Sequence, residues 1–225
     1  AADNSYRYAG ANPNNYVCFG SDASTCPSDN LYRIIGVFGS EVKLIKNSSL
    51  GNYYWSGSSS NQSNTWSSST LNTGTLNRTY LSGLGATWSN KIATHTWYVG
   101  GYSTSSATPK TFYNAESSGT TYNAKIGLMY VSDYGYAASN SYWTKNMSSY
   151  SNATNNNWMY MGLYEWTISR RSDDSVLAFG VDTTGYLYSD YVYYSSSAVR
   201  PSFYLRSSTT YVSGSGSSAD PIRIN

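Results

Sequence analysis

The chain has 225 residues, of which 25 are tyrosine and 12% are charged, about half the charged share of an average soluble protein. Its 42 Ser, 21 Thr and 21 Asn must therefore supply solubility, and its 40% hydrophobic content is enough for one domain over residues 1–225. The net charge of +2 forms no basic stripe, which argues against a nucleic acid partner. No apolar run approaches the ~20 residues of a membrane-spanning helix.

The clearest local structure in the first half is a hairpin. Leu31 to Phe38 and Glu41 to Lys46 are β-rich runs, and the Gly-Ser pair between them suits the tight hairpin turns.

A Ser- and Asn-rich stretch from Ser56 to Ser69 resembles a linker in composition, but Trp55 and Trp66 give it anchors that a flexible linker lacks. Apolar residues then recur every four positions from Leu76 to Ala93, which indicates helix, and two glycines within this range favour two short helices over one.

Strands are expected next at Trp97 to Gly101 and at Ala124 to Val131, with a turn at Ser132 to Gly135. From there on, short strands separated by turns dominate. They are Trp158 to Leu163, Tyr164 to Ser169, Val176 to Val181, Tyr186 to Tyr194, Ala198 to Leu205 and Pro221 to Asn225. The sequence therefore predicts an α+β domain, with short helices in the first half and short antiparallel strands dominating the second.

Two cysteines, Cys18 and Cys26, lie eight residues apart in a segment rich in turn formers. With a single histidine elsewhere, they cannot supply the four ligands of a structural zinc site. A local disulfide is favoured over two free thiols in a reducing compartment, and we expect an extracellular protein at the cell surface. Because the chain begins at Ala1 without methionine, we expect that a signal or an N-terminal anchor has been removed.

Signatures of catalysis are absent from the sequence. His95 is the only histidine, and there is no nucleophile elbow, P-loop or dinucleotide fingerprint. Two carboxylates suffice for glycoside hydrolysis, so Glu165 with an aspartate is the enzymatic alternative, but nothing singles out such a pair. We expect a protein that is not an enzyme and uses no cofactor or metal.

Tyrosines and short polar residues crowd the segment from Arg170 to Ala198. The aromatic residues are Tyr186, Tyr188, Tyr191, Tyr193 and Tyr194, and the charged ones are Arg171, Asp173, Asp174, Asp182 and Asp190. Tyr with Ser and Asp is typical of antibody paratopes. Alternating tyrosines would also cover one face of a sheet, but an adjacent pair puts an aromatic ring on both faces. We therefore predict a ligand-binding surface formed by these ten residues.

The same part of the chain lacks five residue types. From Arg170 to Asn225 there is no Lys, Glu, Gln, Met or Trp, although the first 169 residues contain 6, 3, 1, 4 and 7 of them. At that frequency about seven would occur in the last 56 residues (56 × 21/169).

Two segments resemble the closing half of C-type lectin-like domains of the formylglycine-generating-enzyme type. Glu165-Trp166-Thr167 matches the family's Gly-Asn-Val-Trp-Glu-Trp-Thr strand, and Arg200-Pro201 matches its later Gly-Phe-Arg-Pro strand. The chain is also similar to surface proteins of Firmicutes, some of which lie behind pilin-like membrane anchors. The family's oxidase activity needs cysteines in the C-terminal half, and this chain has none after Cys26. The calcium-dependent sugar motifs of true C-type lectins are absent as well, so neither property is carried over.

The resemblance extends to the variable proteins of diversity-generating retroelements, which use the same fold. In that family, adenine-directed mutagenesis of Asn codons yields residues such as Tyr, Ser and Asp but never Lys, Glu, Gln, Met or Trp. The composition after Arg170 fits this pattern, so the resemblance implies that residues 170–198 form a variable ligand-binding region.

These observations favour a binding module whose ligand is a protein or a glycan. The alternative is a structural pilus or surface-layer subunit, with a glycosidase-like enzyme the least favoured. The residues expected to form the scaffold are Trp158, Trp166, Phe179, Val199 and Phe203.

Overall fold

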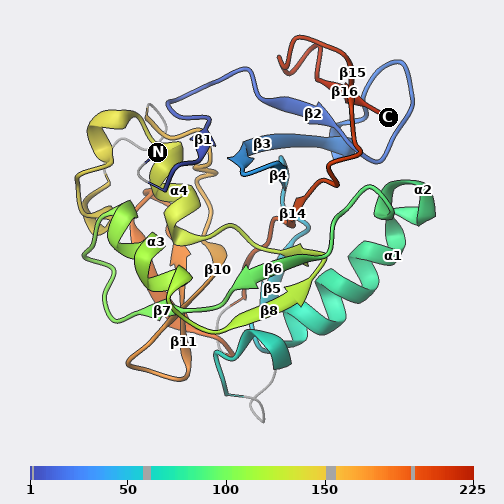
Figure 1. Cartoon of the computed structure of the whole chain (residues 1–225). Helices are drawn as coiled ribbons and strands as arrows, with labels where there is room; N and C mark the ends of the chain where they lie inside the picture. The colour runs from blue at the N-terminus through green and yellow to red at the C-terminus, as the bar shows by residue number, and fades with distance from the viewer. Residues whose placement is uncertain (2, 58–61, 151–155, 194–195) are drawn as a thin grey trace.

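The computed structural model describes residues 1, 3–57, 62–150, 156–193 and 196–225. It contains helices beside two larger sheets whose strands are mostly antiparallel, so the chain is an α+β protein as predicted (Figure 1). No helix among these residues is long and apolar enough to cross a membrane.

The first sheet has six antiparallel strands in the order β1-β3-β4-β14-β9, with β2 also paired to β3. Its strands are β1 (Tyr6–Arg7), β2 (Tyr16–Cys18), β3 (Leu31–Phe38), β4 (Glu41–Lys46), β9 (Ile126–Gly127) and β14 (Ser202–Tyr204). The predicted hairpin is confirmed, because β3 and β4 pair with Phe38 opposite Glu41. Gly39 in its turn has a φ of 60°, which glycine adopts without steric strain.

The second sheet also has six strands, in the order β12-β11-β10-β13-β5, with β7 paired to β10. They are β5 (Asn52–Tyr54), β7 (Gly101–Tyr102), β10 (Glu165–Arg171), β11 (Leu177–Val181), β12 (Leu187–Tyr191) and β13 (Ser196–Ala198). Consecutive strands β10, β11 and β12 are antiparallel, whereas β13 and β7 run parallel to β10. A strand from the first quarter of the chain thus completes a sheet built mainly by the second half.

Two small sheets complete the β-structure. They pair β6 (His95–Tyr98) with β8 (Thr121–Ala124), and β15 (Tyr211–Ser213) with β16 (Arg223–Ile224).

The predicted helical region begins earlier than its apolar pattern indicates. A π-helix, η3 (Leu71–Tyr80), leads into α1 (Leu81–Gly83) and α2 (Gly85–Ser89). The expected glycine break is present, since Gly85 has a φ of 72°. The first turns escaped prediction because their inward-facing side chains include polar Asn72, which is fully buried and donates to the carbonyl of Trp66 at 3.0 Å.

Helices α3 (Pro109–Ser117) and α4 (Val131–Ala137) were not predicted. The expected strand from Ala124 to Val131 is interrupted, and the expected turn at Ser132 to Gly135 is helical. The Asp133 carboxylate accepts a hydrogen bond from the Tyr130 N–H at 2.9 Å and so starts α4. Residues 158–163 also form turns and not the expected strand. Short 3-10 helices lie at η1 (Ser28–Asn30), η2 (Trp66–Ser68), η4 (Asn140–Tyr142) and η5 (Met147–Ser149).

The core contains the aromatic anchors that the sequence indicated. Trp55 and Trp66 are buried and meet edge to face with ring centroids 5.1 Å apart, and the Trp55 indole donates to the carbonyl of Thr167 at 2.9 Å. The polar segment between them is therefore fixed to the core at both ends. All five predicted scaffold residues are buried, namely Trp158, Trp166, Phe179, Val199 and Phe203.

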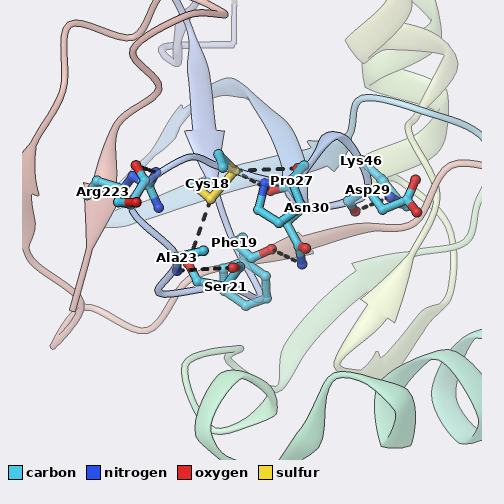
Figure 2. Close-up of a disulfide and its surroundings, with 11 residues drawn as sticks. Cys18, Phe19, Ser21, Ala23, Pro27, Asp29, Asn30, Lys46 and Arg223 are labelled. Carbon is cyan, nitrogen blue, oxygen red and sulfur yellow. Dashed lines mark hydrogen bonds between the residues drawn. A yellow bond between two sulfur atoms is a disulfide. The ribbon is translucent and has the colours of Figure 1, made fainter.

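The predicted disulfide is present between Cys18 at the end of β2 and Cys26, with their Cα atoms 5.8 Å apart (Figure 2). The loop that it closes is held further by the Asn30 amide, which donates to the carbonyl of Phe19 at 3.1 Å. Arg223 near the C-terminus donates to the carbonyl of Ser24 at 2.9 Å. A disulfide is compatible with an extracellular protein.

Replacing both cysteines with alanine should lower the free energy of unfolding by about 2.5 kcal/mol, because the open chain gains the loop-closure entropy of a short loop. Urea titration of the wild type and of the Cys18→Ala/Cys26→Ala variant measures this. Ser21→Ala in the same loop is the matched control and should change little. An unchanged urea midpoint in the double variant would contradict the prediction.

Candidate functional site

Exposed aromatic side chains gather on the second sheet. Among the described residues, nine large apolar or aromatic side chains are exposed, and five of them belong to this sheet or its adjoining turns. These five are Tyr54, Leu163, Tyr164, Tyr186 and Tyr191. We use the term tyrosine surface for the tyrosines of this region, Tyr54, Tyr164, Tyr186, Tyr188, Tyr191 and Tyr193.

Tyr188 on β12 connects several of these residues. Its ring packs edge to face on Tyr164 at 5.3 Å, and its hydroxyl lies 3.3 Å from the Ser197 hydroxyl on β13. Strand β13 in turn pairs with β5, where Ser196 lies opposite Tyr54. Sequence reasoning found Tyr188 but missed Tyr54 and Tyr164, because only the long-range strand pairing brings them to the same sheet.

Strand alternation divides the predicted binding residues of β12 between its two faces. Tyr188 and Asp190 lie on one face, and Ser189 and Tyr191 lie on the other. Tyr191 is 46% exposed, and its ring lies 5.8 Å from that of Tyr193, which packs partly against the core. Tyr194, the remaining predicted aromatic residue, lies outside the described residues.

Arg171 and Asp173 form a surface ion pair beside the Tyr191 face. Arg171 donates from Nε and Nη2 to the two Asp173 oxygens at 2.8 and 2.7 Å, and from Nη1 to the Ser189 hydroxyl at 3.2 Å. The hydrogen bonds from Arg171 lower the pKa of Asp173. This pair is a partly exposed polar group beside Ser189 on the same face as Tyr191.

The other predicted aspartates mainly hold turns. Asp182 accepts hydrogen bonds at Oδ1 from the N–H groups of Thr184 and Tyr186, at 2.8 and 3.0 Å. Asp174 accepts from the N–H of Val176 at 3.0 Å, and Asp190 from the N–H of the next residue at 2.7 Å. In this structure, Asp182 positions the turn that presents Tyr186.

The two segments that carry the family resemblance lie against each other. Arg200 donates from Nε and Nη2 to the two carboxylate oxygens of Glu165 at 2.6 and 2.9 Å, and also to the carbonyl of Met159 at 2.6 Å. Both side chains are almost fully buried, and burial raises the pKa of Glu165 although Arg200 opposes the shift. Because Arg200 occupies both oxygens, Glu165 offers none to a substrate in this arrangement.

A cavity of about 330 Å³ lies at a different place in the molecule. Its wall contains the aromatic residues Phe38, His95, Tyr98, Tyr113, Tyr130 and Tyr204, together with polar residues that include Arg7, Glu116 and Ser132. His95 stacks on Tyr204 at 3.6 Å and lies 2.8 Å from Glu41, and burial lowers the pKa of His95. Sequence reasoning missed this cavity because its residues come from widely separated segments.

No group of three or more His, Cys, Asp or Glu side chains that could hold a metal ion occurs in the part of the chain that the structure describes. Comparison with protein-family models, with curated proteins and with solved structures finds no match to this chain.

Arg200→Leu should lower the free energy of unfolding by about 3–5 kcal/mol, because it leaves the Glu165 carboxylate buried without a partner. Removing both charges in Arg200→Leu/Glu165→Leu should destabilise the protein less than Arg200→Leu alone. Urea titration measures both. Arg206→Leu, which replaces an exposed arginine of the same segment, is the control. Equal effects of Arg200→Leu and Arg206→Leu would show that the buried pair has no such role.

Proposed function

We propose that the chain is an extracellular ligand-binding module with a C-type lectin-like fold, and that the tyrosine surface is its binding site. The observation that carries this proposal is that exposed tyrosines lie on or beside one sheet, from Tyr54 on its edge strand β5 to Tyr191 on the opposite edge strand β12. Tyrosine provides a large contact area at a small loss of side-chain entropy, and neighbouring serines add adaptable hydrogen bonds.

The contact between Glu165 and Arg200 supports the proposed fold. The resemblance rests on two short segments about thirty residues apart, and these segments form one buried ion pair at the start of β10, the central strand of the second sheet. A shared structural role for the two segments is what a common fold requires.

The composition of the site favours contact through aromatic rings and hydroxyl groups over charge. Arg171 and Asp173 are paired with each other, and the carboxylates of Asp174, Asp182 and Asp190 accept hydrogen bonds from backbone N–H groups of their own segments. The partner is therefore a protein or a glycan that offers apolar area together with hydrogen-bonding groups, since tyrosine rings pack on both.

We also propose that residues 170–198 vary between copies of the gene. The positions in this range fall into two classes according to how far their side chains are buried. Among the described residues, the buried class, which the fold requires, is Ala178, Phe179, Gly180, Val181, Gly185, Leu187, Val192, Ser197 and Ala198. The exposed or half-buried class contains the tyrosines of β12 and its turns, so variation there would change the surface without changing the core.

A second candidate function, a pilus or surface-layer subunit, is favoured by one observation. All three residues of strand β15 are exposed, with Tyr211 at 66% and Val212 at 56% exposure. An exposed two-stranded ribbon of this kind offers an edge for pairing with another copy. Concentration-dependent assembly that Val212→Lys prevents would favour this function over a monomeric receptor.

Replacing Tyr186 and Tyr191 with alanine should weaken ligand binding at least tenfold while leaving stability nearly unchanged, because both side chains are exposed. The measurement uses the fluorescently labelled domain on intact cells, by flow cytometry, and on a printed glycan array. Loss of cell binding after protease treatment identifies a protein partner, and loss after periodate treatment identifies a glycan.

Tyr6→Ala and Tyr211→Ala are the matched controls for this experiment, since both tyrosines are exposed but lie outside the second sheet. They should bind like the wild type. If either control variant loses binding as strongly as the Tyr186→Ala/Tyr191→Ala double variant, or if the double variant unfolds, the tyrosine surface is not the site.

Deep sequencing of the gene across its source population should show substitutions at adenines within codons 170–198, concentrated at exposed positions such as Tyr186 and Tyr191. Codons of the buried class should stay constant, because a change there would open a cavity or overfill the core. Variation spread evenly over the whole gene would remove the retroelement proposal and leave a fixed binding protein.

A further inference from the structure

A buried charged cluster lies behind the wall of the cavity. Lys43 on β4 places its Nζ 2.6 Å from Oδ2 of Asp133 on α4, and neither side chain has any exposed area. Arg7 on β1 places Nη1 2.6 Å from the other oxygen, Oδ1, of the same carboxylate. The Asp133 carboxylate therefore contacts two cations, Arg7 on β1 and Lys43 on β4.

Aromatic rings surround the amine of Lys43. Its Nζ lies 4.0 Å from the ring centroid of Tyr130, 4.9 Å from that of Trp97 and 5.2 Å from that of Tyr204. An ammonium group has three N–H donors, but among the described residues Nζ has a single hydrogen-bond acceptor, Asp133 Oδ2. Burial lowers the pKa of Lys43 although Asp133 opposes the shift, so the surroundings make loss of a proton from the ammonium less costly than in water.

The Asp133 carboxyl group is held for attack at its carbon. The Tyr130 N–H donates to Oδ2 at 2.9 Å, and Arg7 donates to Oδ1. Arg7 is itself fixed by Asp3 and by the Ser5 hydroxyl. A guanidinium group at Oδ1 stabilises the negative charge that would develop there when the carbon becomes tetrahedral.

We propose that Lys43 and Asp133 are joined by an intramolecular amide bond that forms within the folded protein. The Nζ–Cγ bond forms and the Cγ–Oδ2 bond breaks. Two protons of the Lys43 ammonium leave with Oδ2 as water, and the third stays on the amide nitrogen. The step is a dehydration in which nothing is oxidised or reduced, so it needs no cofactor or second enzyme.

The charges around Asp133 determine how fast the amide bond forms. Burial raises the pKa of Asp133, but Lys43 and Arg7 lower it more, so the carboxylate is the resting form. Transfer of a proton from Lys43 to Oδ2 is therefore uphill, and the bond forms slowly compared with folding. The released water has a place to go, because Arg7, Tyr130 and Tyr204 also line the 330 Å³ cavity.

The amide would join the centre of the first sheet to α4 and close a loop between residues 90 positions apart. A link of this length restricts the unfolded chain more than the disulfide does. This proposal is independent of the function of the tyrosine surface.

Mass spectrometry of the intact, reduced protein tests the proposal directly. We expect the folded chain to be lighter than its sequence by the mass of one water molecule after prolonged incubation. Trypsin should then fail to cut after Lys43, and fragment spectra should show peptide 34–46 joined to peptide 126–145. Lys43→Arg should have its full sequence mass. Lys46→Arg, the matched control on the same strand, should still lose water.

A wild-type chain that keeps its full sequence mass after this incubation, with native circular dichroism, would overturn the proposal. So would a loss of water that maps to any other pair of residues. Because the decisive measurement uses the wild type, a failure of Lys43→Arg to fold would not affect it.

Discussion

The ion pair between Glu165 and Arg200 fixes the relation between the two large sheets. Strand β13 ends at Ala198 in the second sheet, and β14 begins at Ser202 in the first, so Arg200 lies where the chain crosses from one sheet to the other. Glu165 is the first residue of β10, the strand to which β11, β13 and β7 pair. Because both charges are buried, neither can leave the pair without a large desolvation penalty, and the crossover stays in place. The strands that carry Tyr54, Tyr188 and Tyr191 belong to the same sheet as β10, so the ion pair also helps to hold these tyrosines in place.

A chain with only 12% charged residues has placed several of its charges inside. Glu116, Asp133, Glu165 and Lys43 are all buried, so fewer charges remain for the outer surface, where hydroxyls, amides and tyrosines lie beside pairs such as Arg171 and Asp173. The interior charges are satisfied locally: Glu116, for example, accepts hydrogen bonds from Ser132 and Ser169. Hydroxyls, amides and tyrosine rings interact with a partner only at short range. Binding through these groups should depend weakly on salt, in contrast to binding by a charged patch.

The sequence predicted those features that depend on neighbours along the chain. The Leu31–Phe38 hairpin and the Cys18–Cys26 disulfide are of this kind, and both are confirmed. Helix α4 was mistaken for a turn because the cap at Asp133 resembles turn chemistry. The sequence did not predict features that depend on pairing between distant segments. Tyr54 joins the second sheet only through β13, and Lys43 meets Asp133 across ninety residues, so no local pattern indicates either. The candidate site was therefore predicted in its contiguous part, and only the fold adds Tyr54 and Tyr164.

The position of Tyr188 shows how this sheet could tolerate changes in its surface residues. Its ring lies over Gly180, where a side chain would come within 2.8 Å of both the Tyr188 ring and the carbonyl oxygen of Glu165. The close approach of Tyr188 thus depends on a missing side chain beneath it, and not on a hole shaped by other side chains. A smaller residue at position 188 would uncover backbone that already pairs with neighbouring strands, and it would leave no cavity in the core. Variation at such a position changes what a partner contacts and removes the contact with the Ser197 hydroxyl, while the strand pairing and the buried ion pairs of the scaffold remain.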